Sequence, residues 1–345
     1  MKKYNIGQKL IFTIQQLYAK ATSAVIVQGA IGEWFHTSVG VRQGCLISPM
    51  LFNIFLERIM NEALEEHEGT ISIGGRNITN LRFADDIDGI AGNENELSDL
   101  VTQLDNTSTK FGMEISAEKT KLMANNNNCI SKDITVNGAK LETVKQFKYL
   151  GAIISDNGSK PEIAARTAQT MTALARLKII WKDKNITLMH KIRLQRALIL
   201  SIFLYACETW TLNAELQKKI RAVEMRSLRI ILGISYRDHI TNETIRQTVE
   251  EQLGPYDDLL TIVKKRKLNW YGHVTRSTGL AKVILQGTVE GKRRRGRQRK
   301  LWTDNIQEWT GLTFARSQVM AHDRQKWSEM VQGLSHQRPN DSIRN

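Results

Sequence analysis

The sequence predicts an α+β fold for the first half of the chain, followed by a mainly helical second half that ends in a basic region. Up to about residue 155, short apolar runs and glycine-containing turn signals alternate with helical patterns. From Ser159 onward the pattern of apolar residues turns helical, and from about residue 241 the signals are mixed. Charge divides at about the same place, since residues 1–150 hold 15 Lys and Arg against 17 Asp and Glu, whereas residues 151–345 hold 34 against 18.

Length and composition set the class of protein. At 345 residues the chain has room for two or three domains with sizeable cores. The cysteines lie far apart without C-x-x-C spacing, which indicates reduced thiols and no zinc knuckle; they are Cys45, Cys129 and Cys207. The first residues do not read as a signal peptide, and the longest apolar run is about half of a membrane span. We expect a soluble intracellular protein of the nucleus or cytoplasm, without a membrane partner.

In the first half, the patterns predict helices packed on one face of a small antiparallel sheet. Ser48 and Pro49 suit the start of a helix, and Asn93 with Glu96 resembles a capping pair. The expected elements are a helix over 6–20, a hairpin over 24–37, a helix from 48 to 62, a hairpin around 81–90, a helix from 93 to 111, a hairpin at 136–139 and a strand over 147–154.

The second half begins with what reads as a small helical bundle. Its three helices start at Pro161, at Thr187 and at Asn213, and the last ends at Gly233. We expect one further helix over 257–267. Two short helices follow, one containing Trp302, Ile306 and Trp309, the other Val319, Trp327 and Met330.

Asp85 and Asp86 lie between two short apolar runs, with Gly74 and Gly75 a few residues upstream. Side chains alternate between faces along a strand, so adjacent aspartates share a site only where the backbone turns. Two carboxylates held together repel each other, and Mg²⁺ with its preference for oxygen ligands is the usual neutralising partner. A solvated turn without a metal is the alternative reading of the pair.

A run of basic residues near the C-terminus places seven charges in nine residues. Together with the tryptophans around it, the run could bind RNA or DNA through phosphate contacts and stacking. It could equally be a nuclear-localisation signal or a solvated tail. The basic residues are Lys292, Arg293, Arg294, Arg295, Arg297, Arg299 and Lys300.

Four stretches, in order, resemble the reverse transcriptase of non-LTR (LINE-like) retrotransposons. Gly40-Val41-Arg42-Gln43-Gly44-Cys45, continued by Ser48-Pro49 and Leu51-Phe52-Asn53, is similar to motif B of that family. Phe83-Ala84-Asp85-Asp86 resembles motif C. Phe111-Gly112-Met113-Glu114-Ile115-Ser116 with Lys119-Thr120-Lys121 resembles motif D, and Phe147-x-Tyr149-Leu150-Gly151 resembles motif E, the primer grip.

The resemblance implies a partial right-hand polymerase. Residues 1–155 would form part of the palm, 156–235 a helical thumb-like bundle, and 236–345 a basic nucleic-acid-binding region. The activity would be RNA-directed DNA polymerisation, with an RNA template, a DNA primer and deoxynucleoside triphosphates as partners. Two Mg²⁺ ions would promote nucleotidyl transfer.

The resemblance also implies a role for single residues. Asp85 and Asp86 would be catalytic metal ligands, and Lys119 would act near the triphosphate as an electrostatic stabiliser or proton donor. An ordinary surface lysine is the alternative for Lys119. The nucleotide and template pocket would be lined by Arg42, Gln43, Gly44, Phe83 and Ala84, and the primer grip would be formed by Tyr149, Leu150 and Gly151.

One part of the family pattern is missing. Motif A should supply a further metal-binding aspartate ahead of motif B, but residues 1–38 contain no Asp, and Glu33 is their only acid. The fingers are missing too. We therefore expect a truncated element or partial gene model that is inactive as a polymerase alone. The alternatives are a non-catalytic RNA- or DNA-binding protein derived from such an element, and a relic without a selected role.

Overall fold

A computed structural model describes residues 1–37, 39–124, 132–288 and 299–334. These residues divide into two compact units. The N-terminal unit holds Met1–Ser72, Arg76–Thr120 and 132–141, and the C-terminal unit holds Ile73–Gly75, 121–124, 142–288 and 299–334. The three-part division at residues 155 and 235 stays a prediction. No helix among the described residues is long and apolar enough to cross a membrane.

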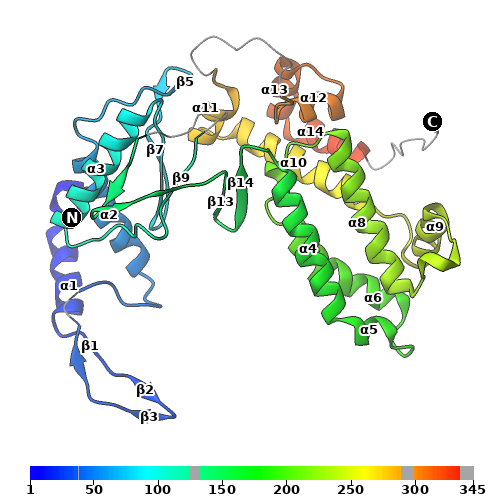
Figure 1. Cartoon of the computed structure of the whole chain (residues 1–345), viewed down its shortest axis with the longest axis horizontal. Helices are drawn as coiled ribbons and strands as arrows, with labels where there is room; N and C mark the ends of the chain where they lie inside the picture. The colour runs from blue at the N-terminus through cyan, green and yellow to red at the C-terminus, as the bar shows by residue number, and fades with distance from the viewer. Residues whose placement is uncertain (38, 125–131, 289–298, 335–345) are drawn as a thin grey trace. The chain divides into compact units, whose positions relative to one another are not determined.

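Helices α2 and α3 form the centre of the N-terminal unit and pack side by side (Figure 1). Phe55 and Phe111 meet edge to face, with ring centroids 6.1 Å apart, and Leu56, Ile59 and Leu100 are buried between the elements. The helices of this unit are α1 (Gln8–Ala19), α2 (Ser48–Ala63) and α3 (Glu94–Lys110).

The strands of the N-terminal part are short and pair two by two. The described residues contain no larger sheet, so the expectation of one small antiparallel sheet is wrong. Most of these strands are only two residues long, and each pair closes the loop or turn that lies between its two strands. The pairs are β1 (Thr22–Ser23) with β4 (Phe35–His36), β2 (Ile26–Val27) with β3 (Ala30–Ile31), β5 (Ser72–Ile73) with β6 (Arg76–Asn77), β7 (Asn80–Phe83) with β8 (Asp86–Gly89), and β10 (Thr135–Val136) with β11 (Ala139–Lys140).

In the C-terminal unit, β9 (Lys121–Leu122) pairs in parallel with β12 (Glu142–Thr143). Residues 147–154 do not form the single strand that was expected. They belong to a hairpin of β13 (Gln146–Tyr149) and β14 (Ala152–Ser155), which turns at Leu150 and Gly151. Leu150 has φ 46° and Gly151 has φ 80°, so both residues adopt the left-handed conformation of a tight turn.

Helices make up the rest of the C-terminal unit, and Figure 1 shows α4 and α8 side by side. The predicted cap at Asn213 is confirmed, because its side chain accepts from the Leu216 N–H at 2.9 Å. The helices are α4 (Lys160–Arg176), α5 (Lys178–Lys182), α6 (Leu188–Leu194), a π-helical segment (Gln195–Ile199), α7 (Leu200–Phe203), α8 (Ala214–Leu232), α9 (Asn242–Leu253), α10 (Leu259–Arg276), α11 (Leu280–Gln286), α12 (Asp304–Thr310), α13 (Phe314–His322) and α14 (Arg324–Gly333).

Three helix predictions need correction. The helix from Pro161 breaks at Leu177, which separates α4 from α5. The helix expected over 257–267 continues to Arg276, and the two short helices expected after residue 300 are three. The physical reason is burial: one core joins Phe203 and Trp210 with residues of α10, α12, α13 and α14, so that the C-terminal helices complete the core of the bundle.

Candidate functional site

The aspartate hairpin is confirmed. Strands β7 and β8 pair from Asn80–Gly89 to Phe83–Asp86, which leaves Ala84 and Asp85 as a two-residue loop. Ala84 has φ 53°, a left-handed conformation that closes the turn tightly. Asp85 therefore lies in the loop and Asp86 begins β8, and both side chains are exposed. Phe83, which is 62% exposed, and Ala84 lie beside them on the surface.

The hairpin is attached to the helix that follows the motif B-like loop. Arg82 of β7 donates to the Glu57 carboxylate of α2 at 2.8 Å. On the other strand Gly89 lies against α3, where an added Cβ would come within 3.2 Å of the Leu100 side chain. The stretches that resemble motifs B and C thus lie in one unit, and the hairpin contacts both α2 and α3.

Asp85 and Asp86 offer the oxygen donors that a hard divalent cation prefers. Within the described residues, however, no group of three or more His, Cys, Asp or Glu side chains converges as a metal cluster. The two aspartates therefore fit as part of a magnesium site and not as a complete one.

The loop before α2 is held by Arg42. Its guanidinium donates to the Leu17 carbonyl at 3.0 Å and lies 5.7 Å from the ring centre of Tyr18, so this side chain is engaged with α1 and its end. Ser48 does not cap α2 as expected. Its hydroxyl donates at 2.7 Å to the Arg42 carbonyl and closes the loop, and the helix N-cap is Ile47 without a side-chain bond.

Three other predicted residues of the N-terminal unit are exposed. Gln43 and Gly44 lie in the loop before α2, where Gly44 has φ 81°. Lys119 lies on a turn in which the Ser116 carbonyl accepts from the Thr120 N–H at 3.0 Å. Within the described part of the chain the Lys119 ammonium makes no ion pair, so its proposed role stays a prediction.

The turn of the motif E-like hairpin is fixed by side chains from distant parts of the C-terminal unit. The Tyr205 hydroxyl donates to the Leu150 carbonyl at 2.7 Å, and the Arg166 guanidinium donates to the Gly151 carbonyl. Arg166 also lies 4.6 Å from the ring centre of Tyr205. Tyr149, the third predicted primer-grip residue, pairs with Ala152 at the end of β13.

Most of the predicted basic run, namely Lys292, Arg293, Arg294, Arg295 and Arg297, lies outside the described residues. Its last two members have partners within the C-terminal unit. Arg299 donates to the Asp156 carbonyl at 2.6 Å, and Lys300 forms an ion pair with Glu308. These two side chains thus bind protein groups, and their role in nucleic-acid binding stays a prediction.

The tryptophans around the basic run are mainly core residues. Trp309 and Trp327 are buried, and Trp302 is half-buried, with its indole N–H donating to the Glu208 carbonyl at 2.9 Å. The prediction that the tryptophan rings stack on nucleic-acid bases is wrong for Trp309 and Trp327, because both rings are buried in the protein core. Trp270 differs, since it is 38% exposed.

A buried lysine joins the C-terminal helices to the bundle. Lys267 of α10 is fully buried, and its Nζ donates to the Trp210 carbonyl at 2.7 Å and to Asn305 Oδ1 at 3.0 Å. The same nitrogen lies 4.3 Å from the ring centre of Trp302. Burial, reinforced by the Lys300 charge, lowers the pKa of Lys267 to about 6.

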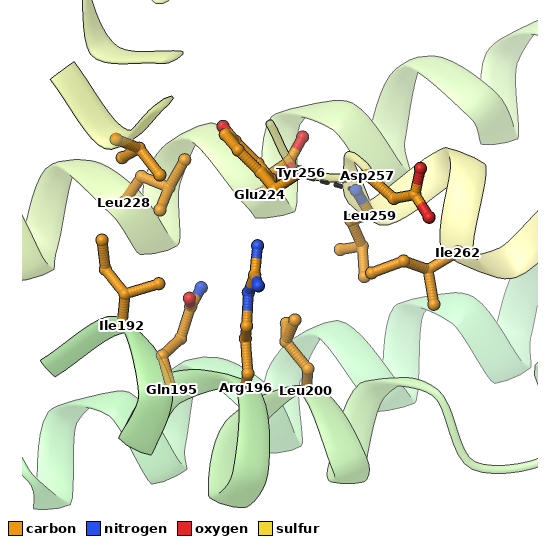
Figure 2. Close-up of a pocket in the computed structure, with 11 residues that line it drawn as sticks. Ile192, Gln195, Arg196, Leu200, Glu224, Leu228, Tyr256, Asp257, Leu259 and Ile262 are labelled. Atoms are coloured by element: carbon orange, nitrogen blue, oxygen red, sulfur yellow. Dashed lines mark hydrogen bonds between the residues drawn. The ribbon is translucent and has the colours of Figure 1, made fainter. Parts of the chain in front are cut away.

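A small cavity of about 20 Å³, room for about one water molecule, lies between the helices of the bundle (Figure 2). Its wall includes Glu224, whose carboxylate accepts from the Leu259 N–H at 2.8 Å. Burial, together with the Asp258 charge, raises the pKa of Glu224 to about 7. The cavity is too small for a nucleotide.

Sequence reasoning missed the side chains that hold the motif E-like turn. Glu162 and Arg166 are four residues apart on α4, a spacing typical of ion pairs within a helix. Arg166 Nε lies 2.6 Å from Glu162 Oε1. The spacing predicts that the two side chains form an ion pair, but it does not predict that the pair is buried. Tyr205 carried no signal, because its partner Leu150 is 55 residues away in the chain.

Comparison with known proteins shows which family the chain is similar to. The family described as reverse transcriptase (RNA-dependent DNA polymerase) matches residues 1–154. A transposon-derived protein of Caenorhabditis elegans is 30% identical over 275 residues, which are 75% of this chain and 97% of that protein.

Two retrovirus-related Pol polyproteins from the type-1 retrotransposable element R2 are similar to this chain as well. The one from Nasonia vitripennis is 28% identical over 156 residues, 42% of this chain and 15% of the polyprotein. The one from Popillia japonica is 27% identical over 176 residues, 47% of this chain and 28% of the polyprotein. The chain thus corresponds to only a part of each polyprotein.

The ordered motifs and the family match define a reverse transcriptase domain. More particularly, the chain belongs to the reverse transcriptase family of non-LTR retrotransposons, with R2 Pol polyproteins among its relatives.

Proposed function

We propose that this domain takes part in RNA-directed DNA synthesis on a primed RNA template, with deoxynucleoside triphosphates as substrates. The single observation that carries the proposal is the exposed Asp85–Asp86 turn, on a hairpin that contacts α2 and α3 in a chain of this family. A right-hand arrangement, in which the N-terminal unit is part of the palm and the helices after residue 156 are the thumb, belongs to the same proposal.

Seven of the predicted site residues have a role in the proposal. Asp85 and Asp86 would hold Mg²⁺, which when bound neutralises negative charge on the triphosphate and the primer terminus. Gln43 and Gly44 would contact nucleotide or template from their exposed loop. Lys119 is exposed and could reach a triphosphate, and Leu150 and Gly151 would contact the primer.

We further propose that residues 1–345 alone do not extend a primer, because two metals need a third carboxylate. Residues 1–38 hold only Glu33 as an acid, and it lies in the loop between β3 and β4. Primer extension with Mg²⁺, a primed RNA template and the four triphosphates tests this. We expect primed template to bind without being extended. Template-dependent extension that disappears in Asp85→Asn would contradict inactivity and support the assignment of the hairpin.

A second candidate is a non-catalytic RNA- or DNA-binding protein. The excess of basic residues after residue 150 supports it, since neutralising phosphates drives salt-dependent binding. The basic run could also direct the protein to the nucleus. Binding that falls with salt, survives Asp85→Ala and is lost when Arg293, Arg294 and Arg295 become Gln would favour this candidate. Binding that depends on a recessed primer end would favour the polymerase.

A further inference from the structure

A cleft of about 640 Å³ lies within the N-terminal unit. Its walls come from four segments, namely the 3₁₀ turn Lys2–Tyr4, the second half of α1, the loop before α2, and α2 itself as far as Arg58. Pockets that bind small molecules commonly have volumes of about 300 to 1,000 Å³. The cleft is therefore large enough for a small organic ligand.

Most of the cleft wall is aliphatic. Ile14 of α1 and Leu51 and Ile54 of α2 contribute half-buried side chains, and Val41 of the loop is 43% exposed. Phe55 adds an aromatic ring that is 39% exposed. Covering apolar surface stabilises a complex by about 25 cal/mol per Å². The wall therefore favours a ligand with a flexible hydrocarbon body.

The charged side chains that line the cleft are all cationic, and they are Lys2, Lys3 and Arg58. Arg58 is paired with Glu62, whose carboxylate lies 2.6 Å from the guanidinium. Lys2 and Lys3 are exposed, and neither forms an ion pair within the described part of the chain. Because the described lining contains no Asp or Glu, its charge favours an anion over a cation.

The frame of the cleft is held by bonds that need no ligand. The Ser48 hydroxyl donates to the Arg42 carbonyl and lies 3.3 Å from the Tyr18 hydroxyl, so the loop and the start of α2 are joined to α1. The Asn61 amide donates to the Tyr4 hydroxyl at 3.4 Å, which joins the 3₁₀ turn to α2. The cleft is therefore formed before a ligand binds, as is usual for small-molecule sites.

We propose that this cleft binds a long-chain carboxylate, with the hydrocarbon chain between α1 and α2 and the carboxylate beside Lys2 and Lys3. Such a molecule covers the aliphatic wall and balances the two unpaired charges at once. A nucleic acid would balance the charges but leave the aliphatic wall exposed. The inference does not rest on the proposed function, since it uses no residue of the Asp85–Asp86 turn.

Fluorescence titration of the full chain with dansylaminoundecanoate tests the proposal. This probe is a long-chain carboxylate whose emission rises in apolar surroundings, and we expect one probe to bind per chain with saturation. Dodecanoate should displace the probe. Dodecanol, which lacks the charge, should displace it about fivefold less well, and dodecyltrimethylammonium should not displace it.

Matched variants separate the cleft from general surface charge. Lys2→Gln with Lys3→Gln should weaken probe binding about fivefold and leave dodecanol binding unchanged. Lys9→Gln with Lys20→Gln is the control, since it removes two exposed lysines, one in α1 and one at its C-cap, that do not line the cleft. Ile54→Trp fills the cleft and should weaken binding of the probe and of dodecanol alike.

Each other result overturns a stated part of the proposal. Absence of saturable binding, or binding that Ile54→Trp leaves unchanged, contradicts the site. Equal affinities in the two lysine variants contradict the selection of an anion. If light scattering finds a dimer that binds no probe, a second copy covers the cleft and the proposal is wrong. Should urea denaturation show that Ile54→Trp does not fold, Val41→Trp on the exposed loop makes the same test.

Discussion

Lys267 gives the sharpest prediction about stability. The side chain is buried where its nitrogen donates to the Trp210 carbonyl and to Asn305 Oδ1. A neutral amine has two N–H donors, which match these two acceptors. We predict that Lys267 is neutral in the folded protein at pH 7, and that Lys267→Met removes a pH dependence of stability which the wild type shows.

The sign and size follow from proton binding. Burial lowers the pKa of Lys267 from its ordinary value of 10.5 to about 6, so between these values the unfolded chain binds one proton more than the folded chain. The free energy of unfolding must then rise with pH by about 1.4 kcal/mol per unit, or about 2.7 kcal/mol from pH 7 to pH 9. Lys267→Met lacks the titrating amine. The free energy of unfolding of the wild type should therefore rise from pH 7 to pH 9 by about 2.7 kcal/mol more than that of Lys267→Met.

Urea denaturation at pH 7, 8 and 9, followed by tryptophan fluorescence, measures the effect. Six of the seven tryptophans belong to the C-terminal unit, so the signal reports on the unit that contains Lys267. All other titrating groups are common to both proteins and cancel in the difference. Parallel stability curves for wild type and Lys267→Met would mean that Lys267 is charged in the folded protein, which contradicts the prediction.

Three further predictions concern the same fold. Burial raises the pKa of Glu224 to about 7, so the folded state binds the proton of this carboxyl more strongly than the unfolded state does. The free energy of unfolding, measured by urea denaturation, should therefore fall between pH 5 and pH 7, by about 2 kcal/mol more in wild type than in Glu224→Gln. Glu162→Ala strands the buried Arg166 charge and should lower the free energy of unfolding by about 3 kcal/mol, and an effect below 1 kcal/mol would contradict the pairing. Asn213→Ala removes the helix cap and should lower the free energy of unfolding by about 1 kcal/mol. Arg82→Ala removes a solvent-exposed ion pair and should lower it by less, and thermal unfolding measures both effects.

Local chemistry in the sequence predicts the elements whose causes are local. Asn213 caps α8 through the N–H three residues on, and Gly233 ends it with φ 69°. The Asp85–Asp86 turn is closed by immediate neighbours, and the Asn137–Gly138 turn pairs Val136 with Ala139 as expected. In each case the deciding contacts lie within a few residues, so the pattern of residue types was sufficient.

The predictions that failed depend on contacts between distant residues. The prediction of one strand over 147–154 failed because leucine residues seldom adopt a positive φ, whereas Leu150 has φ 46°. The turn is held by bonds from Arg166 and Tyr205, which lie far away in the chain. No prediction was made for the burial of Lys264-Lys265-Arg266-Lys267, and in the structure Lys267 is buried in the core. Burial of this kind is set by packing and not by residue type.

Cleavage by a bound metal ion locates the Asp85–Asp86 turn on the nucleic acid. Fe²⁺ in place of Mg²⁺, with ascorbate and peroxide, generates hydroxyl radicals that cut DNA close to the metal. With a labelled primer on an RNA template, we predict cuts confined to the last nucleotides before the 3′ end. These cuts should be lost in the double variant Asp85→Asn with Asp86→Asn, while anisotropy still reports binding. Cuts spread evenly along the primer, or unchanged in that double variant, would contradict the claim that this turn meets the primer terminus.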